Sequence, residues 1–407
     1  MIVEASSRSE RVLLLVAVAL VGLNLRPFIT GVGPLAAEIS AGTGLDLKGI
    51  SLLTLAPMLL MGLFAFAGPV LQSRVGARRS VIASLVVLVF GSVLRLFATN
   101  GWQMVGTAAL LGLGVAVIQA VFPGIVKRQF PRHVGVVMGL YSAALMGGGA
   151  LGAQAAPLIA AAARDWRIGL AWMAVPAVLA LLLAVRTLPR DGAAGRTRAS
   201  VLALVKRPRV WLLMACFGLV NGGYSTVVAW LAPFYREHGW SAAASGGLLA
   251  IMAVCQALAA LVLPVLASGR DMRPWLWLTL AMQAAGFAAL AFRPEAAPLA
   301  SAMVLGAGLG GCFALSMIVA LDHLPDPAEA GALSALMQGG GFLITALPPW
   351  IVAALHDVTG DFFAGWLLHL ACVGAVAVLY RRVTPASYAG AMRLALPAVA
   401  APARPRI

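Results

Sequence analysis

Apolar residues run along this chain in long unbroken stretches that short polar connections separate. A helix that crosses about 30 Å of hydrocarbon needs about 20 such residues, whereas a membrane barrel would alternate polar and apolar positions. The pattern therefore predicts an all-α membrane protein. Its twelve transmembrane helices are predicted near residues 12–37, 47–71, 80–98, 102–126, 135–162, 168–187, 210–235, 242–267, 275–292, 297–321, 331–355 and 363–380.

The composition agrees with a membrane location. Of the 407 residues, 61% are hydrophobic and 11% are charged, and the mean hydropathy is +0.95. Soluble domains are about 45–50% apolar and about 25% charged, so this chain has too few polar side chains to cover a surface in water. A net charge of +15 would suggest nucleic acid in a soluble protein. Because cytoplasmic loops of membrane proteins collect Lys and Arg, we expect a lipid bilayer and no nucleic acid as partner.

The basic residues predict the orientation of the chain. Alternate loops and the two terminal segments hold 22 of the 29 Lys and Arg, the opposite loops hold five, and Arg26 and Arg95 lie within spans. This bias places both termini in the cytoplasm. The chain contains 26 Arg and 3 Lys and is rich in Ala, which is typical of a bacterium with a GC-rich genome. We expect a multi-pass protein of the bacterial inner membrane.

The chain divides into two similar halves. The longest hydrophilic connection separates spans six and seven, which predicts an N-terminal bundle at 1–187, a cytoplasmic linker at 188–209, a C-terminal bundle at 210–381 and a cytoplasmic tail at 382–407. SAALMGGG at 142–149 matches SALMQGGG at 334–341, and Pro157 matches Pro349 at the same offset of 192. Duplicated six-helix halves related by an axis along the membrane normal are typical of a major-facilitator-type transporter.

The loop PVLQSRVGARR at 69–79 resembles the signature loop of the major facilitator superfamily. Pro69, Arg74, Gly76 and Arg78 match that signature, in which Gly permits a tight turn and basic residues contact neighbouring helix ends. Ser73 stands where an acidic residue is usual. That departure questions the charge-relay part of the signature's role and leaves the fold prediction intact.

Six further motifs resemble one branch of this superfamily, the branch named for cyanate and 2-nitroimidazole transporters. They are NLRP at 24–27, PGIVKRQFP at 123–131, GLYSAA at 139–144, AWLAP at 229–233, LSALMQGGG at 333–341 and LHDVTG at 355–360. The resemblance covers essentially the whole chain. It implies the major facilitator fold of two pseudo-symmetric six-helix bundles, a central cavity lined by spans one, four, seven and ten, and transport of a small-molecule substrate by alternating access.

Arg26 is the first candidate for binding that substrate. It lies 14 residues into the first predicted span, or about 21 Å at 1.5 Å per residue, just beyond the middle of a bilayer. A charge there costs roughly 2.5–3.5 kcal/mol, so it should face protein or a water-filled cavity. Pro27 removes a backbone donor and bends the helix. Arg26 either binds an anionic substrate or ties span one to carbonyl groups or a polar side chain on another helix.

Other polar and aromatic side chains within the spans complete the predicted substrate site. Asn24 is two residues from Arg26, about 200° around a helix, so the two side chains do not both face the cavity unless Pro27 distorts the turn. Asn221 and Tyr224 form one stripe on span seven. Each of these candidates either binds substrate or bonds a neighbouring helix. Trp230, near the outer end of its span, either binds substrate or anchors the span at the membrane interface. The remaining candidates are Gln119, Tyr141, Trp230, Gln256 and Gln338.

None of the 14 acidic residues is predicted near mid-membrane, which argues against a standard proton antiporter. We therefore expect movement of a small anion, or of a small polar compound, by facilitated diffusion, by exchange or with the substrate's own proton. The alternative is a multidrug or antimicrobial exporter whose pocket is lined by Met, Phe and Trp.

Chemistry of other kinds is not indicated. The sequence contains no nucleophile paired with a base and no cluster of metal ligands, and the four cysteines all fall in apolar runs. The glycine runs at 147–149 and 339–341 favour close helix packing over nucleotide binding. The sequence thus predicts that the protein is not an enzyme and has no catalytic residue, cofactor or metal. We expect a monomer.

Overall fold

The computed structural model describes residues 8–66, 71, 74–189, 203–267 and 271–392. Over these residues the secondary structure is entirely helical. The first half contains α1 (Arg8–Leu23), α2 (Pro27–Thr30), η1 (Gly33–Leu35), α3 (Ala36–Thr43), α4 (Leu47–Ala65), α6 (Ala77–Leu94), η2 (Arg95–Phe97), α7 (Gly101–Gln129), α8 (Val134–Ala163), α9 (Trp166–Ala171) and α10 (Ala174–Thr187). The second half contains α12 (Pro208–Glu237), α13 (Ala242–Leu266), α14 (Arg273–Phe292), α15 (Pro298–Asp322), α16 (Pro327–Thr345), α17 (Leu347–Thr359), α18 (Phe363–Tyr380), η3 (Pro385–Ser387) and α19 (Tyr388–Met392).

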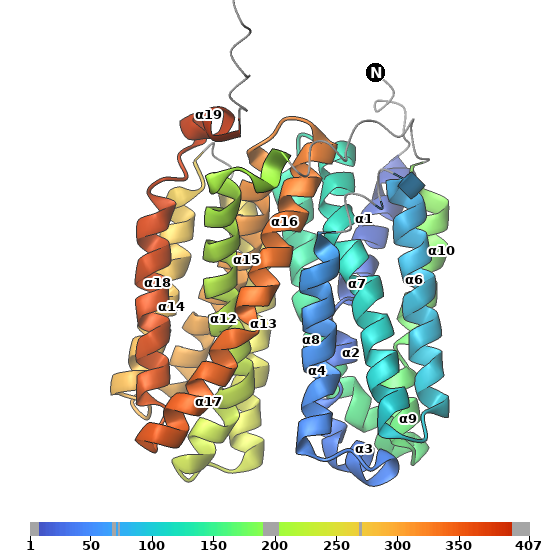
Figure 1. Ribbon diagram of the computed structural model, residues 1–407, viewed down its shortest axis with the longest axis vertical. Coiled ribbons are helices and arrows are strands. Elements are labelled where there is room, and N and C mark those ends of the chain that lie inside the picture. The colour runs from blue at the N-terminus through green and yellow to red at the C-terminus, as the bar shows by residue number, and fades with distance from the viewer. Residues whose placement is uncertain (1–7, 67–70, 72–73, 190–202, 268–270, 393–407) are drawn as a thin grey trace, which may run out of the picture.

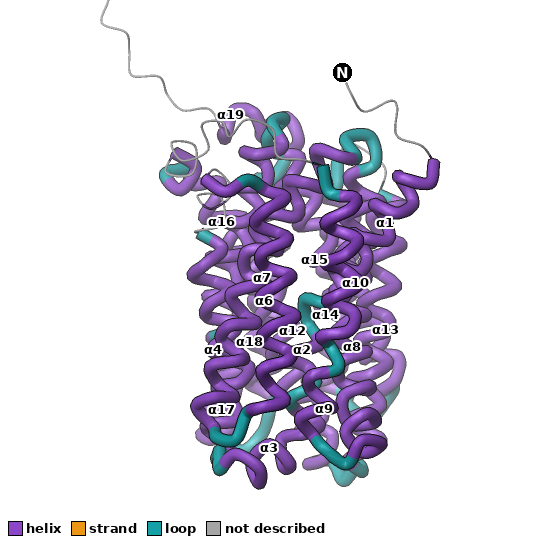
Figure 2. Tube along the Cα trace, turned by 90° about the vertical axis from the view of Figure 1, so that its right-hand side faces the viewer, coloured by secondary structure: helices purple, strands orange, loops and turns teal. Residues whose placement is uncertain are grey.

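The two halves stand side by side, and the axes of their long helices are roughly parallel (Figure 1). Figure 2 shows from the side that most connections gather at the two ends of the molecule. We call the end at which α1 begins and α19 lies the terminal end, and the other the opposite end. Most of the predicted linker at 188–209 lies outside the described residues, so that boundary stays a prediction.

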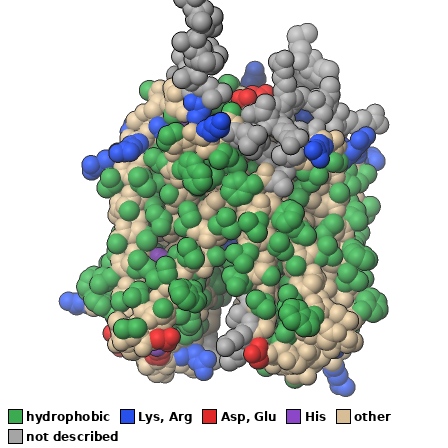
Figure 3. Space-filling view, in the orientation of Figure 1, with side chains coloured by type: hydrophobic (Ala, Val, Ile, Leu, Met, Phe, Trp, Pro, Cys, Tyr) green, Lys and Arg blue, Asp and Glu red, His purple; other side chains and the backbone are tan. Residues whose placement is uncertain are grey.

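The predicted all-α membrane fold is confirmed. Among the described residues, 11 helical segments are long and apolar enough to cross a membrane, and α4 contributes a shorter apolar helix at Leu52–Ala65, where the second span was predicted. On the face drawn in Figure 3, a mostly hydrophobic band separates the charged side chains at the two ends. Such a band is the surface that a bilayer requires.

The first span is a broken helix. α1 ends at Leu23 and the next helical turn, α2, begins at Pro27. Because proline has no backbone N–H and a fixed φ, it suits the first position of a helix and interrupts one that is already running. Arg26 is the residue that precedes α2, with φ −119° and ψ −30°. The predicted bend at Pro27 is thus a full interruption of the helix, and Arg26 lies within it.

Glycines on α8 let the broken segment lie directly against that helix. A methyl group at Gly148 would lie 2.1 Å from the carbonyl oxygen of Leu23, and one at Gly152 would lie 2.5 Å from the Cα of Pro27. At Gly149 a methyl group would lie 3.3 Å from the Cβ of Arg26. The prediction that the glycine run permits close helix approach is confirmed.

The halves meet mainly through α4 with α16, α7 with α16 and α8 with α13. Near the terminal end, a methyl group at Gly124 of α7 would lie 3.3 Å from the Cα of Gly331 on α16. Deeper in, Gln338 of α16 donates to the carbonyl oxygen of Gln119 on α7 at 3.1 Å. In Figure 3 the surface is hollowed between the halves at the opposite end. The molecule is therefore closed at the terminal end and open at the opposite end.

The segment after the last span docks at the terminal end through a ring stack. The imidazole ring of His323, which follows α15, stacks on the Tyr388 ring of α19, with 3.9 Å between the ring centroids and an interplanar angle of 19°. The His323 side chain is 2% exposed, and its Nδ1 lies 2.7 Å from the Val319 carbonyl oxygen. Burial lowers the pKa of His323 to about 4. The folded chain therefore holds this imidazole neutral.

We expect Gly148→Ala to destabilise the protein, because the new methyl group would overlap with the Leu23 backbone. A backbone cannot move aside by rotating, as a flexible side chain can. Overpacking of this kind costs about 1–3 kcal/mol or more. Gly147→Ala is the matched control, since a methyl group there has no neighbour within 4 Å. Melting temperatures in detergent measure both variants. Equal melting temperatures would contradict this account of the α1–α8 contact.

The stability of the protein should fall as the pH drops from 6.5 towards 4. In this window the unfolded chain protonates His323 and the folded chain does not, so the contribution is complete above pH 6.5 and is lost as the pH falls. The full effect is roughly 3 kcal/mol. His323→Phe keeps the stack on Tyr388 and should lose this part of the pH dependence. The exposed His133→Gln serves as control, and a His323→Phe profile identical to that of the wild type refutes the assignment.

Candidate functional site

Arg26 lies between the two halves with an aromatic ring as its main partner. Its Cζ is 5.0 Å from the centroid of the Tyr224 ring, which belongs to α12 of the other half. The residue is 8% exposed, and its Nε is buried without a hydrogen-bond partner. Among the described residues, no carboxylate or carbonyl group accepts a hydrogen bond from this guanidinium. A cation over an aromatic face is stabilised by about 0.5–2 kcal/mol. The ring carries no net charge, so the positive charge of Arg26 is not neutralised.

The broken helix fixes the place of this cation. In Figure 1, α2 is labelled below mid-height, on the side of the opposite end. Within the break, Ile29 N and Thr30 N donate to the Arg26 carbonyl oxygen at 3.1 and 3.3 Å. Thr30 Oγ1 donates to the Gly149 carbonyl oxygen of α8 at 2.7 Å. The backbone of Arg26 is thus tied down within its own half while the guanidinium extends towards the other.

Three other predicted residues bring polar groups to the region between the halves. Two of them have buried polar atoms without partners, and the third forms a hydrogen bond from one half to the other. Both side-chain polar atoms of Gln119 and the hydroxyl of Tyr141 are buried without hydrogen-bond partners. The Tyr141 ring stacks on that of Phe122, with their centroids 5.4 Å apart. The Gln338 amide joins Gln119 across the halves. Buried polar groups are normally satisfied, so these unpaired atoms mark where a polar ligand or water belongs.

The two predicted asparagines hydrogen-bond to backbone carbonyl groups, Asn24 within its own helix and to a second helix, Asn221 within its own helix only. The Asn24 amide donates to the carbonyl oxygens of Leu20 at 2.7 Å and of Pro176 on α10 at 3.1 Å. The Asn221 amide donates to the Phe217 carbonyl oxygen at 2.8 Å within α12. Asn24 and Arg26 therefore part at the break, one towards α10 and the other towards α12.

Neither Trp230 nor Gln256 makes a hydrogen bond or ring contact with Arg26 or Tyr224 in the described part of the chain. Trp230 Nε1 donates to the Pro349 carbonyl oxygen of α17 at 2.9 Å. Gln256 of α13 is 5% exposed, and its side chain has no hydrogen-bond partner among the described residues. The structure thus brings Arg26 together with Tyr224, and Gln119 with Gln338, and gives Trp230 a bracing contact.

The signature loop is described in part, and its glycine and one of its arginines have assigned contacts. Gly76 has φ +97°, which favours glycine, and α6 begins directly after it. Arg78 Nη2 donates to the Val185 carbonyl oxygen at 2.6 Å, near the end of α10. Arg74 is exposed. Pro69 and Ser73 lie outside the described residues.

Lys127, predicted only as a charge of a cytoplasmic loop, joins the two halves. Its ammonium, at the end of α7, donates to the carbonyl oxygens of Leu321 and Leu324 at the end of α15. The last carbonyl groups of a helix lack backbone donors, and the helix dipole makes that end negative. Asp322 and Asp326 add further attraction. The signal was available in the sequence, as a lysine at the end of one predicted span with acids at the end of another.

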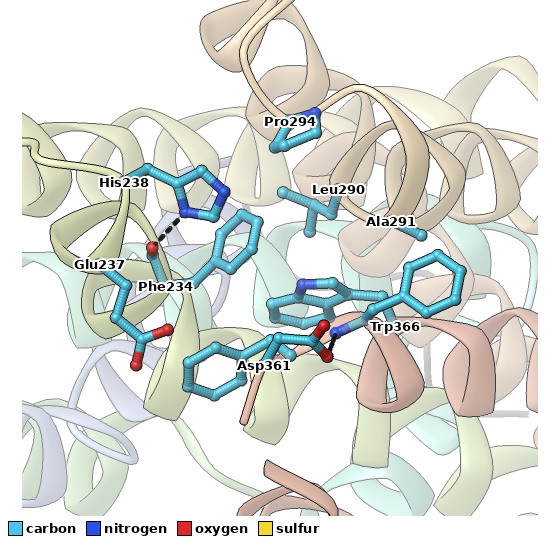
Figure 4. Close-up of a pocket in the computed structure, with 10 residues that line it drawn as sticks. Phe234, Glu237, His238, Leu290, Ala291, Pro294, Asp361 and Trp366 are labelled. Atoms are coloured by element: carbon cyan, nitrogen blue, oxygen red, sulfur yellow. Dashed lines mark hydrogen bonds between the residues drawn. The ribbon is translucent and has the colours of Figure 1, made fainter. Parts of the chain in front are cut away.

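Two surface cavities lie away from this region. One, of about 240 Å³, is lined by Phe234, Trp366 and neighbours from α12, α14 and α18 at the opposite end (Figure 4). The other, of about 530 Å³, is lined by residues that include Asp46 and Trp102. None of the predicted substrate-binding residues lines either cavity. Over the described residues, no group of three His, Cys, Asp or Glu side chains is arranged to hold a metal.

Comparison with known proteins identifies the family. Residues 13–349 match the sequence profile described as Major Facilitator Superfamily. The chain belongs to this superfamily. The cyanate transport protein CynX of Escherichia coli (strain K12) is 41% identical to it over 376 residues, covering 92% of this chain and 98% of that protein. The 2-nitroimidazole transporter of the same organism is 27% identical over 361 residues, covering 88% and 91%.

A solved structure agrees on the fold. The proton:xylose symporter XylE, a major facilitator superfamily protein, superimposes with a TM-score of 0.77 at 14% sequence identity, over 93% of this chain and 96% of that one. The predicted fold and the predicted resemblance to cyanate and 2-nitroimidazole transporters are both confirmed. The protein is a multi-pass membrane transporter of a small-molecule substrate, and it is not an enzyme.

We expect Lys127→Met to favour opening of the terminal end, because it removes the ammonium that holds the end of α15. The buried Ser334, whose Oγ lies 3.4 Å from Gln338 Nε2, provides a nearly isosteric reporter as Ser334→Cys in a chain without its native cysteines. Maleimide labelling of this thiol should accelerate about tenfold, the change expected for a loss of about 1.4 kcal/mol.

Lys127→Arg keeps the charge and should label close to the wild-type rate. Arg128→Met removes an exposed charge from the adjacent position and is the matched control. Equal labelling of all variants would show that Lys127 does not hold the terminal end closed.

Proposed function

We propose that the protein moves a small anion of the cyanate type, or a small polar compound of the nitroimidazole type, with Arg26 as its central cationic site. The observation that carries the proposal is the Arg26 guanidinium, buried between the halves with no carboxylate or carbonyl partner among the described residues. The 41% identity to a cyanate transport protein and the 27% identity to a 2-nitroimidazole transporter support this substrate class.

In this proposal the anion completes a site that the protein leaves open. It accepts hydrogen bonds from Arg26, while the ring of Tyr224 lines the other side and the hydroxyl of Tyr141 donates to it. Charge-assisted hydrogen bonds of this kind are about twice as strong as neutral ones. A ligand held between Arg26 of one half and Tyr224 of the other links the two halves. Its binding energy then offsets the cost of closing the opposite end.

The proposed cycle takes place in the inner membrane of a bacterium, in a single chain with both termini in the cytoplasm. The excess of basic residues in alternate loops supports this orientation. The opening at the opposite end then faces outwards (Figure 3). The absence of acidic residues from the predicted mid-membrane region supports facilitated diffusion, exchange or coupling through the substrate's own proton.

Uptake of labelled cyanate into proteoliposomes tests this function. Arg26→Ala removes both the charge and its donors and should lower kcat/KM about a hundredfold, the equivalent of about 2.7 kcal/mol. Arg26→Lys keeps the charge without the two-pronged geometry and should retain part of the rate. Arg128→Ala, at an exposed position, is the control and should transport as the wild type does.

Wild-type rates in Arg26→Ala would refute the cationic site. Extrusion of a fluorescent drug panel by wild-type vesicles, without any cyanate flux, would instead favour the multidrug or antimicrobial exporter.

A further inference from the structure

Arg95 is a second buried arginine, outside the site described above. It is the first residue of η2, directly after α6, and it is 0% exposed. The short η2 helix packs against α6 and α9. A fully buried guanidinium is expensive, so a chain keeps one only where its hydrogen bonds hold something in place.

The group that Arg95 holds belongs to the broken first span. Its Nη1 donates to the carbonyl oxygen of Phe28 at 3.2 Å. The regular helical donor to that oxygen would be the N–H of Val32, four residues later, but Val32 N donates to the Ile29 oxygen at 3.2 Å instead. α2 is only four residues long, so its carbonyl groups lack the following turn. Arg95 supplies the donor that the interrupted backbone does not.

The short helix α2 is thus fastened on two sides. Thr30 Oγ1 binds it to the Gly149 carbonyl oxygen of α8, and Arg95 binds it to η2. Phe28, whose oxygen Arg95 holds, is two residues after Arg26. Any tilt of α2 would therefore move the guanidinium of Arg26 relative to the Tyr224 ring.

Arg95 also places a positive charge against α2. Its Nε and Nη2 are buried without hydrogen-bond partners, and among the described residues no carboxylate lies within salt-bridge distance of it. In an apolar interior, a charge acts over longer distances than it does in water. Two uncompensated arginines near one short helix raise the positive potential there, which favours an anion and disfavours a cation.

We propose that Arg95 is a positioning residue of the transport site: it fixes α2, and with it Arg26, and its charge strengthens the attraction for a small anion. The second part rests on the proposed function, whereas the first concerns the backbone alone. Arg95 does not touch the substrate in this assignment. Its loss should therefore weaken substrate binding more than it slows the movement of the halves.

Two measurements test the assignment. The first is amide hydrogen exchange of the segment 26–32, read by mass spectrometry on the full-length protein in detergent. In Arg95→Met this segment should exchange at least tenfold faster, because the Phe28 carbonyl has lost its donor. The second is labelled cyanate uptake, in which Arg95→Met should raise KM about tenfold with a smaller change in kcat, because a displaced Arg26 loses about one charge-assisted hydrogen bond to the anion.

Arg167 provides the matched control. Like Arg95 it donates to a backbone carbonyl oxygen, in its case from Nε to that of Ala98 at 2.8 Å, just after η2, and it has no hydrogen bond to α2 among the described residues. Arg167→Met should leave both the exchange of 26–32 and the KM unchanged. Arg95→Lys, which keeps the charge and one donor, should recover part of both effects, and it decides the question if Arg95→Met does not fold.

Wild-type exchange and wild-type KM in a folded Arg95 variant would overturn the proposal. Faster exchange in Arg95→Met, combined with normal cyanate transport by Arg26→Ala, would leave the positioning of α2 intact and refute the proposed function instead. The two failures are therefore distinguishable.

Discussion

A positive charge inside an apolar bundle needs a partner, and the first span of this transporter holds such a charge with no acidic partner among the described residues. The helix stops at Leu23 and starts again at Pro27, which frees Arg26 from a regular helical position. Glycines on α8 give the interrupted backbone room, and Thr30 and Arg95 fasten it. The result is a guanidinium with a fixed position and an aromatic ring, rather than a carboxylate, beside it.

That position matters because the two halves are in contact towards one end of the molecule and separated towards the other. Towards the terminal end, small residues, the Gln338–Gln119 bond and Lys127 bring the halves together. Towards the opposite end the surface between them is hollowed (Figure 3). Arg26 belongs to one half and Tyr224 to the other, so a ligand between them would sense the relative movement of both. Alternating access requires a site of this kind, shared by two bodies that separate on one side at a time.

The sequence predicted the fold well because hydrophobic length and repeat spacing are local properties. It also predicted that Pro27 disturbs the first span and that the glycine runs pack closely, since backbone chemistry and side-chain size decide both. It could not choose between a helix contact and a cavity for Asn24, because that depends on which neighbour, here Pro176 on α10, lies within reach. The role of Arg95 was missed for the same reason: its acceptor is the backbone oxygen of Phe28, 67 residues away, and a carbonyl group leaves no trace in a sequence.

The most direct test of the central claim is to locate a bound anion. Selenocyanate is a linear anion like cyanate, and its selenium scatters anomalously, so crystals soaked with it report the position of the ion. We predict a selenium peak between the Arg26 guanidinium and the Tyr224 ring, which disappears in Arg26→Ala crystals. A transported anion bound elsewhere, with Arg26 still stacked on Tyr224, would contradict the account.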